Sequence, residues 1–542
     1  MEQYLKTTFD PETKIWSGIN MSPKFGPDCS IGKVVLDALL KEPDHICQIC
    51  YHNGKQYTNR EIVNLSICIA LHFKDLGLQQ QDIIGICASN SDYVAPVFIG
   101  AMFCGLIVST LDPSFDKDGI KHIYGITKPK ILFCDGGIYE TLKEAFQEIN
   151  LESDIYTIKD HIVGVPNVTN LFKEVTDKTS FEPVTLRDGC HQTAVIVCSS
   201  GTTGLPKGVS MSHINSLNAS SSIRTPGENI NFSYSTLYWT SGLFTQINCL
   251  VWNITRVIID KPYNAEEFFD IIQKYKVTYI ITPPSQLAMS LASPKLEDYD
   301  LSSLKTYFCG GSAVPYKLVK KFMPYVPNAK FFVGYGMTEC GSPVAYGIPN
   351  SCNGCIGQLT PRTKVKIIDD DGKQLGPGEI GEICMWPQFP WSGYFNNMEA
   401  TNSMYINGWL HSGDLGYMDE NGILYIVDRK KDILKYNNFH FYPTEIEQII
   451  MEIPDVVEVC VCGVPDIVSS HLPTAAVVRK LGSDLTETEV YDYVAEKMAH
   501  FKHLRGGVYF TNSLPKTASG KYLRRDVLKI CEELYKNKQL NR

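Results

Sequence analysis

The segment Ser199–Gly208, SSGTTGLPKG, places small residues, hydroxyl groups and one lysine directly after the apolar run Thr193–Cys198. Small residues let the backbone approach a phosphate closely, while amide groups, hydroxyls and the Lys207 ammonium supply donors and positive charge. The spacing does not match the P-loop pattern GxxxxGK[ST], so a P-loop NTPase is not supported. Taken alone, the segment is either a phosphate-binding loop of another type or an ordinary flexible glycine loop.

A second candidate is Gly334–Glu339, GYGMTE, which follows the apolar run AKFFV. The aromatic face of Tyr335 suits a purine, and the Glu339 carboxylate is a hard oxygen ligand of the kind that Mg²⁺ prefers. The local alternative is a turn into a helix with Thr338 as its N-cap. We therefore expect a nucleotide site here only if other motifs accompany this one.

Two more segments carry glycines or charges where predicted strands end. Cys309–Ala313, CGGSA, is either a tight strand-to-helix turn or part of a ligand pocket. Asp414, in GWLHSGD, could accept hydrogen bonds from the two hydroxyls of a ribose. Arg429 lies across a predicted hairpin from it and could reach the ribose or a phosphate. The alternatives are a turn residue for Asp414 and a surface ion pair for Arg429.

The segment Pro515–Lys521, PKTASGK, lies in a basic C-terminal stretch that also contains Arg524 and Arg525. A lone lysine in such a stretch is usually a solvated side chain. When a carboxylate attacks a phosphoryl group, however, the protein mainly has to stabilise negative charge on the phosphoryl oxygens, and a lysine can do so. Lys521 is the candidate for this role, provided that the other motifs converge on it.

The elements that must position these groups are short apolar strands alternating with longer mixed segments between residues 30 and 350. Buried parallel strands read as continuous apolar runs, and repeated strand–loop–helix units predict layered α/β sheets with ligands at the strand carboxyl ends. Predicted strands of this part are Ile83–Cys87, Ile131–Cys134, Thr193–Cys198, Thr278–Thr282, Thr306–Cys309 and Phe331–Val333.

The pattern changes after Gly354, where turn sequences such as DDDG and DENG join short strands. They predict a smaller, largely antiparallel, barrel-like subdomain with strands at Val365–Asp369, Gly381–Trp386 and Ile423–Asp428. A compact α+β unit follows, with a helix at Thr444–Glu452, strands at Val456–Val461 and Ala475–Arg479, and a capping box formed by Thr486 and Glu489. We place the boundary so that residues 1–430 form the large domain and residues 431–542 the small one.

Composition narrows the class of protein. The chain has 542 residues and a formal net charge of -9, which disfavours a nucleic-acid partner because such proteins need a basic face. The N-terminus has no apolar signal region, and the apolar stretch Val94–Leu111 is interrupted by proline and glycine, which predicts a buried helix running into a strand rather than a membrane span. We expect an intracellular protein, cytoplasmic or peroxisomal, although the C-terminus is not an S-K-L signal. Two isolated CxxC pairs are more simply reduced thiols than a zinc site.

Together these motifs resemble the adenylate-forming superfamily, which includes acyl-CoA synthetases, 4-coumarate–CoA ligases and beetle luciferases. The resemblance extends from about Gly32 to Lys521 and is greatest to insect luciferase-like fatty acyl-CoA synthetases. It implies ATP, Mg²⁺ and coenzyme A as ligands, with Thr338 on the AMP phosphate, Glu339 on Mg²⁺ and Lys521 as the catalytic lysine. The nucleotide-binding residues that it implies are Ser199, Ser200, Gly201, Thr202, Thr203, Gly204, Lys207, Gly310, Gly311, Ser312, Tyr335, Gly336, Asp414 and Arg429.

The resemblance also implies that the small domain rotates between two half-reactions, with Lys431 as the hinge. After the rotation Lys435 would approach the substrate. The acyl pocket would include Trp239, Thr240, Ser241 and Phe244. This chain departs from the family at two positions. Asn438 replaces a glycine on the path of the pantetheine arm, and Trp239 replaces a histidine that many relatives carry.

The function expected from the sequence is ATP-dependent ligation of a fatty or similar apolar carboxylic acid to coenzyme A. The alternatives are a luciferase-type monooxygenase, which the tryptophan disfavours, and a degenerate relative that binds nucleotide or lipid without turnover, which the intact charged motifs oppose. A peptide-synthetase adenylation domain is less favoured, because the chain ends soon after Lys521. The partner is a small-molecule acid. Peripheral membrane contact and the oligomeric state stay open.

Overall fold

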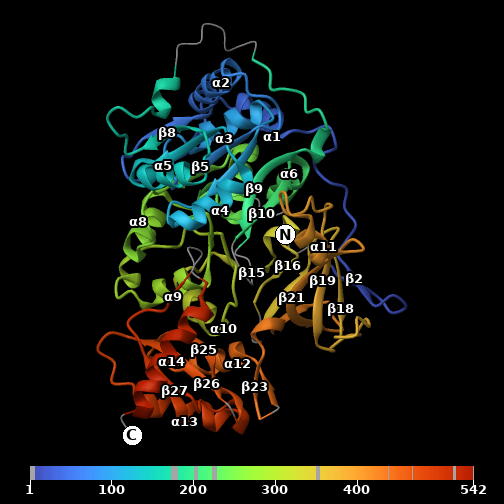
Figure 1. The fold of residues 1–542 in the computed structure, drawn as a ribbon, viewed down its shortest axis with the longest axis vertical. Coiled ribbons are helices and arrows are strands. Elements are labelled where there is room, and N and C mark those ends of the chain that lie inside the picture. Colours follow the sequence, from blue (N-terminus) through green and yellow to red (C-terminus); the bar gives the residue numbers. More distant parts are fainter. Residues whose placement is uncertain are drawn as a thin grey trace.

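The computed structural model describes residues 6–172, 181–199, 206–221, 229–349, 354–437, 439–466, 468–516 and 521–540. Figure 1 shows two α/β layers in the upper part, antiparallel strands at one side, and a separate C-terminal unit below them. A mixed α/β architecture with a small C-terminal domain, as predicted, is confirmed.

The first sheet has six strands in the order β10-β9-β6-β5-β7-β8, parallel except for the β9–β10 pair. Its central strands are buried along their whole length, which explains their continuous apolar sequences. The strands are β5 (Ile83–Cys87), β6 (Ile107–Leu111), β7 (Ile131–Asp135), β8 (Asp154–Lys159), β9 (Thr193–Ser199) and β10 (Lys207–Ser212). Helices of this layer are α1 (Ile31–Lys41), α2 (Asn59–Asp75), α3 (Val94–Phe103), α4 (Lys117–Thr127), α5 (Tyr139–Glu148), α6 (His213–Ser221) and α7 (Thr240–Trp252).

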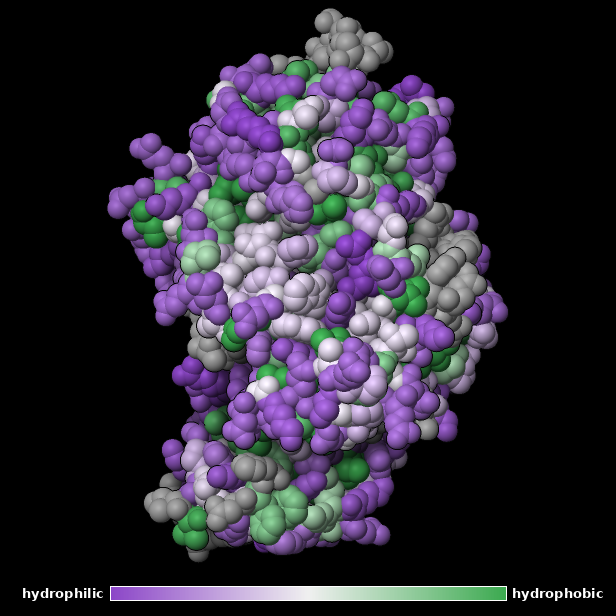
Figure 2. Space-filling model, turned by 90° about the vertical axis from the view of Figure 1, so that its right-hand side faces the viewer, coloured by the Kyte–Doolittle hydropathy of each residue, from purple (hydrophilic) through white to green (hydrophobic). Residues whose placement is uncertain are grey.

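The apolar stretch Val94–Leu111 is a buried helix, α3, followed by the buried strand β6. All ten residues of α3 are buried, and α3 packs against α1 and α2. Within the described residues, none of the helices has the length and apolar character needed to cross a membrane. On the face drawn in Figure 2, hydrophilic side chains dominate and hydrophobic residues form small separate patches.

The second sheet has sixteen strands and joins two kinds of pairing. One part is mainly parallel, and α8 (Ala265–Tyr275), α9 (Pro284–Ala292) and α10 (Tyr316–Phe322) follow its strands along the chain. Its strands are β3 (Ile46–Cys50), β4 (Gln56–Thr58), β11 (Ile230–Phe232), β12 (Thr255–Ile258), β13 (Tyr279–Thr282), β14 (Thr306–Gly310) and β15 (Lys330–Tyr335).

The other part of this sheet is antiparallel, as the turn-rich sequence after Gly354 predicts, and it continues the same sheet through β16 and β17. The short hairpin of β1 and β2 pairs with β18 through β2, so β1 is the edge strand of this part of the sheet. The strands are β1 (Thr8–Asp10), β2 (Ile15–Ser17), β16 (Ala345–Gly347), β17 (Cys355–Leu359), β18 (Lys364–Ile368), β19 (Gly381–Trp386), β20 (Tyr405–Ile406), β21 (Trp409–Met418) and β22 (Leu424–Arg429), with helix α11 (Met398–Met404) before β20.

The C-terminal unit is a five-stranded sheet with three helices, drawn in orange and red in Figure 1. The predicted capping box is present, since the Thr486 hydroxyl accepts from the Glu489 amide and the Glu489 carboxylate accepts from the Thr486 amide. The elements are β23 (Leu434–Tyr436), β24 (Phe439–Phe441), β25 (Val456–Asp466), β26 (Ser470–Arg479), β27 (Gly507–Phe510), α12 (Pro443–Ile450), α13 (Glu487–Lys497) and α14 (Arg524–Leu540).

The connection to this unit is a short 3₁₀ turn, Lys430–Asp432. Contacts on both sides fix its ends. Lys430 pairs with Asp370 and Glu382 of the large sheet, at 2.9 and 3.5 Å. Asp432 lies 3.9 Å from Arg524, the first residue of α14. Lys431 therefore lies between a residue tied to the large domain and a residue that faces the small one.

Candidate active site

A cavity of about 890 Å³ lies between the carboxyl ends of strands from both sheets and reaches the C-terminal unit. Residues directly after β5, β6, β13, β14 and β15 contribute to its wall, as expected for ligand sites of α/β sheets. The predicted site residues that line it are Trp239, Thr240, Ser241, Phe244, Gly310, Gly311, Tyr335, Gly336, Thr338 and Lys521.

Tyr335, Asp414 and Arg429 meet although they come from different motifs. Register places Asp414 opposite Arg429 on β21 and β22, and the Arg429 Nε atom lies 3.4 Å from Asp414 Oδ1. The Tyr335 hydroxyl donates a hydrogen bond of 2.7 Å to Asp414 Oδ2. Burial first, and then the neighbouring Asp414 carboxylate, raise the pKa of Tyr335 well above its usual value. A neutral tyrosine and a cation thus hold the Asp414 carboxylate beside the cavity, where it is suited to accept from a diol.

Glu339 lies in the 3₁₀ turn Thr338–Cys340, and its side chain is buried. Thr338 is therefore the first residue of that turn; Met337 holds the N-cap position without a side-chain hydrogen bond, so the N-cap interpretation of Thr338 is wrong. The Glu339 Oε1 atom accepts a hydrogen bond of 2.7 Å from the hydroxyl of Tyr394. The Lys207 ammonium lies 4.9 Å from the centre of the same tyrosine ring.

Tyr394 is a residue that the sequence analysis missed. It lies 55 residues from Glu339, in a turn-rich segment before α11 without strand or helix periodicity. It is buried, with 7% of its surface exposed. No local sequence pattern indicates this tyrosine, because Glu339 and Lys207 come close to it only in the folded protein.

Lys521 lines the cavity at the end of the described part of the PKTASGK segment. Burial is the main cause that lowers the pKa of Lys521, and the Arg429 cation lowers it further. Asp414 and Glu339 act in the opposite direction and raise it. The charges of Arg429, Asp414 and Glu339 thus all influence the pKa of Lys521, while its catalytic role stays a prediction.

The remaining predicted residues are placed as follows. Lys435 is exposed on β23 and Ser312 is exposed beyond Gly311, and neither lines the cavity in this arrangement. Lys431 is exposed in the connecting turn, and Ser199 is half-buried at the end of β9. Outside the described residues lie Ser200, Gly201, Thr202, Thr203, Gly204 and Asn438.

The pocket segment before α7 is held by local contacts. Trp239 and Tyr238 meet edge to face with ring centres 4.5 Å apart. The Ser241 hydroxyl donates to the Ser235 hydroxyl oxygen at 2.9 Å. Both serines and Trp239 line the cavity, so the predicted acyl pocket has an aromatic wall beside a hydroxyl-bearing one.

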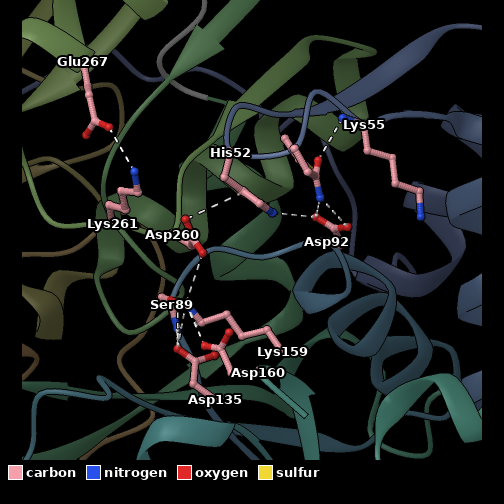
Figure 3. A network of polar contacts seen from close by, with 12 residues as sticks. His52, Lys55, Ser89, Asp92, Asp135, Lys159, Asp160, Asp260, Lys261 and Glu267 are labelled. Carbon is pink, nitrogen blue, oxygen red and sulfur yellow. Dashed lines mark hydrogen bonds and ion pairs between the residues drawn. The ribbon is translucent and has the colours of Figure 1, made fainter.

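Figure 3 shows a charged network that the sequence analysis did not predict. Its residues Ser89, Asp135, Lys159 and Asp260 also line the cavity. Lys159 at the end of β8 lies 3.7 Å from Asp135 and 3.3 Å from Asp260, which follows β12 of the other sheet. His52 lies 3.8 Å from Asp260, and Ser89 donates to Asp135 from both its amide and its hydroxyl. Burial raises the pKa of Asp135. The Lys159–Asp260 pair therefore bridges the two sheets beside the cavity.

The donor set fits a nucleotide with Mg²⁺. Within the described ranges, no group of three or more histidine, cysteine or acidic side chains could hold a metal ion by itself. Mg²⁺ is commonly bound by one or two carboxylates together with substrate phosphates, and Glu339 supplies one such carboxylate beside Lys207. The residues present are therefore compatible with an ion that arrives with a nucleotide.

Comparisons with known proteins agree with this geometry. Residues 37–395 match the family model described as "AMP-binding enzyme", and residues 445–521 match its C-terminal domain. The chain is 30% identical to "Probable 4-coumarate--CoA ligase 3" of Dictyostelium discoideum over 92% of this chain and 95% of that protein. It is 32% identical to "Luciferin 4-monooxygenase" of Nipponoluciola cruciata, covering 89% of this chain and 90% of that one.

Among solved structures, the anthranilate CoA ligase AuaEII in complex with anthranoyl-AMP aligns with a TM-score of 0.85 at 22% identity, covering 94% of this chain and 98% of that one. This likeness supports the fold. The two family matches and the curated relatives lead to one assignment, and they agree with the place of Tyr335 and Lys521 at one cavity and of Asp414 beside Tyr335. The chain belongs to the AMP-binding, adenylate-forming enzyme family that includes acid–CoA ligases and luciferases.

Proposed function

We propose that this protein adenylates an apolar carboxylic acid with ATP and then transfers the acyl group to the thiol of coenzyme A. The observation that carries the proposal is the approach of Lys521, from the C-terminal unit, to the cavity lined by Tyr335 and Thr338. A cation at this place faces the region where negative charge develops during attack on a phosphoryl group.

In the first half-reaction, a carboxylate oxygen forms a bond to the α-phosphorus, and the bond to the bridging oxygen breaks so that pyrophosphate leaves. Asp414 holds the ribose, Tyr335 lies against the base, and Lys207 and Lys521 balance phosphoryl charge. An Mg²⁺ ion held by Glu339 would add positive charge at the phosphates. Trp239 and Phe244 border the acid and limit the access of water to the mixed anhydride.

In the second half-reaction, the thiol sulfur forms a bond to the acyl carbon while the bond to the phosphate oxygen breaks. AMP leaves and the thiol proton is lost to solvent. The C-terminal unit turns at Lys431 for this step and exchanges Lys521 for the β23 face with Lys435. Lys435 is exposed in the present arrangement, which is consistent with its use after such a turn.

The apolar character of the acid is supported by the side chains of Trp239, Phe244 and Met337 along the cavity. The test is a panel of aliphatic and aromatic acids with ATP, in which pyrophosphate exchange and acyl-CoA are both measured. We expect both products with at least one apolar acid. Absence of exchange with every acid would contradict adenylation, whereas exchange without acyl-CoA would contradict the thioester step alone. Light emission with luciferin and ATP would instead support the monooxygenase alternative.

A further inference from the structure

Tyr394 connects two segments that the proposed reaction needs. Its own backbone is fixed to the strand after the glycine loop: the Phe395 amide donates to the Gly208 carbonyl at 2.7 Å, and the Ser210 amide donates to the Gly393 carbonyl at 3.1 Å. Residue 394 therefore lies beside Val209 of β10, with which it forms an isolated bridge. The backbone at Tyr394 is thus held to strand β10 by contacts that do not involve the tyrosine side chain.

The side chain of Tyr394 contacts two opposite charges. Its hydroxyl donates to Glu339 Oε1 at 2.7 Å, and its ring centre lies 4.9 Å from the Lys207 ammonium. The ring is fixed from a third side by Trp391, whose ring centre is 4.8 Å away. One buried aromatic residue therefore holds a carboxylate at its polar end and a cation at its face.

The chemistry of the contact matters for a metal ligand. Glu339 is 5% exposed, and a buried carboxylate needs a partner. If a lysine were that partner, the ion pair would compete with Mg²⁺ for the same oxygens. A tyrosine hydroxyl stabilises the ionised carboxylate without cancelling its charge, so the full negative charge stays available to the cation.

Lys207 is the cation that could otherwise pair with Glu339, because its ammonium lies over the ring of Tyr394 while the carboxylate accepts from the hydroxyl of the same residue. The attraction between the ammonium and the ring face holds Lys207 at the ring, so Lys207 does not form an ion pair with the Glu339 carboxylate. We propose that Tyr394 is a positioning residue that keeps the Lys207 ammonium and the Glu339 carboxylate apart, so that each stays available for the phosphates and for Mg²⁺. The inference rests on the proposed function.

Two variants separate the two contacts. Tyr394→Phe keeps the ring beside Lys207 and removes the hydroxyl, so Glu339 loses its hydrogen bond. We expect the half-saturating Mg²⁺ concentration for pyrophosphate exchange to rise about tenfold, the loss expected for one hydrogen bond to a charged group, with kcat at saturating Mg²⁺ within about threefold of wild type. Tyr394→Leu removes both contacts, and we expect ATP binding without Mg²⁺ to weaken as well.

A matched control is Tyr405→Phe. Tyr405 also meets Trp391, with ring centres 5.9 Å apart, and its burial likewise raises its pKa, but no contact with Lys207 or Glu339 is described for it. We expect Tyr405→Phe to keep the wild-type Mg²⁺ dependence. The melting temperature of each variant shows whether it folds.

A second measurement does not depend on turnover. ATP binding to the wild type and to Tyr394→Phe is titrated calorimetrically with and without Mg²⁺. The inference expects a weaker effect of Mg²⁺ in the variant and equal binding of metal-free ATP. Equal Mg²⁺ dependence in both proteins, in binding and in exchange, would overturn it. Failure of the wild type to exchange pyrophosphate with any acid would contradict the proposed function, and the binding comparison would still decide the role of Tyr394.

Discussion

The Tyr335 hydroxyl donates to the Asp414 carboxylate at 2.7 Å across 79 residues of sequence. The bond joins the end of β15 in the parallel part of the large sheet to β21 in its antiparallel part. The residue proposed to lie against the base and the residue proposed to hold the ribose are therefore fixed relative to each other before a nucleotide binds.

This contact predicts the effect of changing Asp414. In Asp414→Asn, the side chain loses its charge, Arg429 loses its counter-ion and the diol loses a strong acceptor. We expect the KM for ATP to rise about tenfold to a hundredfold, with a smaller change in kcat, because the affected hydrogen bonds involve a charged group. Pyrophosphate exchange at varied ATP measures this. Glu420→Gln, an exposed change in the turn of the same hairpin, is the control. An unchanged KM for ATP would refute the ribose role.

Lys521 predicts a defined pH dependence. Because burial and Arg429 lower its pKa, the ammonium loses its proton at a lower pH than a free lysine does. Adenylation that needs the ammonium is present below this pKa and is lost as pH rises through it. We expect Lys521→Ala to lower exchange about a hundredfold or more, and Lys521→Arg to shift the alkaline limb upward.

The measurement for Lys521 is the pH profile of pyrophosphate exchange at saturating ATP and acid. Lys529→Ala changes a lysine in helix α14 that pairs with Asp526, and it should leave the profile unchanged. If Lys521→Ala exchanged pyrophosphate at the wild-type rate, the catalytic assignment would be wrong.

The burial of His213 leads us to expect that the folded protein loses stability at acid pH. His213 is buried, and its Nδ1 atom accepts a hydrogen bond from the Ile31 amide at 3.2 Å. Burial lowers the pKa of His213 from 6.5 to about 3. The neutral ring therefore contributes stability above pH 6.5 that is lost as pH falls from 6.5 toward about 3, because the unfolded chain binds the proton more readily.

For one such group the free energy of unfolding falls by at most about 1.4 kcal/mol per pH unit. We expect His213→Asn, whose side chain keeps an acceptor, to be less stable at neutral pH but to show a shallower decline on acidification. Urea unfolding across this pH range measures the two slopes, with the exposed His191→Gln as control. Parallel slopes for wild type and His213→Asn would show that His213 does not contribute.

The position of Lys431 leads us to expect a variant that impairs acyl-CoA formation but not adenylation. Lys430 is tied to Asp370 and Asp432 faces Arg524, so Lys431 is the residue between the two anchors. Proline at this position fixes φ and should restrict the turn. We expect Lys431→Pro to keep pyrophosphate exchange within about threefold while acyl-CoA formation falls about a hundredfold, the scale reached when a reacting group is misplaced. Lys431→Ala, which keeps torsional freedom, should retain both, and a proportional loss of both activities in the proline variant would contradict a hinge.

The strands were predictable wherever burial on both faces made the sequence continuously apolar. The predicted Ile83–Cys87 coincides with β5 for this reason. The predicted Gly381–Trp386 also coincides with β19, although it contains Glu382 and the exposed Trp386. The predicted Val456–Val461 is shorter than β25, which extends to Asp466, because Gly463 and Pro465 break the local pattern while pairing with β26 continues through them. Tertiary pairing here overrides local propensity.

The candidate site was predictable where chemistry and spacing coincide in a short motif. Tyr335, Asp414, Arg429 and Lys521 were named from such motifs. Tyr335 and Lys521 line one cavity, and Asp414 contacts both Tyr335 and Arg429, while the roles of all four stay predictions. Tyr394 and the Lys159–Asp260 pair were missed, because each depends on a partner more than fifty residues away in sequence. A contact between residues so far apart leaves neither a periodic pattern nor a typical local composition in the sequence.

The large sheet has one further consequence. Backbone pairing runs without interruption from β15 through β16, β17 and β22 to β21, so Tyr335 and Asp414 are parts of one hydrogen-bonded framework. Lys521 belongs to a separate sheet and helix set beyond the turn at Lys431. The proposed recognition of the nucleotide and the proposed delivery of the lysine would thus be carried by two parts of the chain with their own hydrophobic cores. If the proposed function holds, substitutions in the C-terminal unit would alter the fate of the acyl group and leave the preference for adenine unchanged.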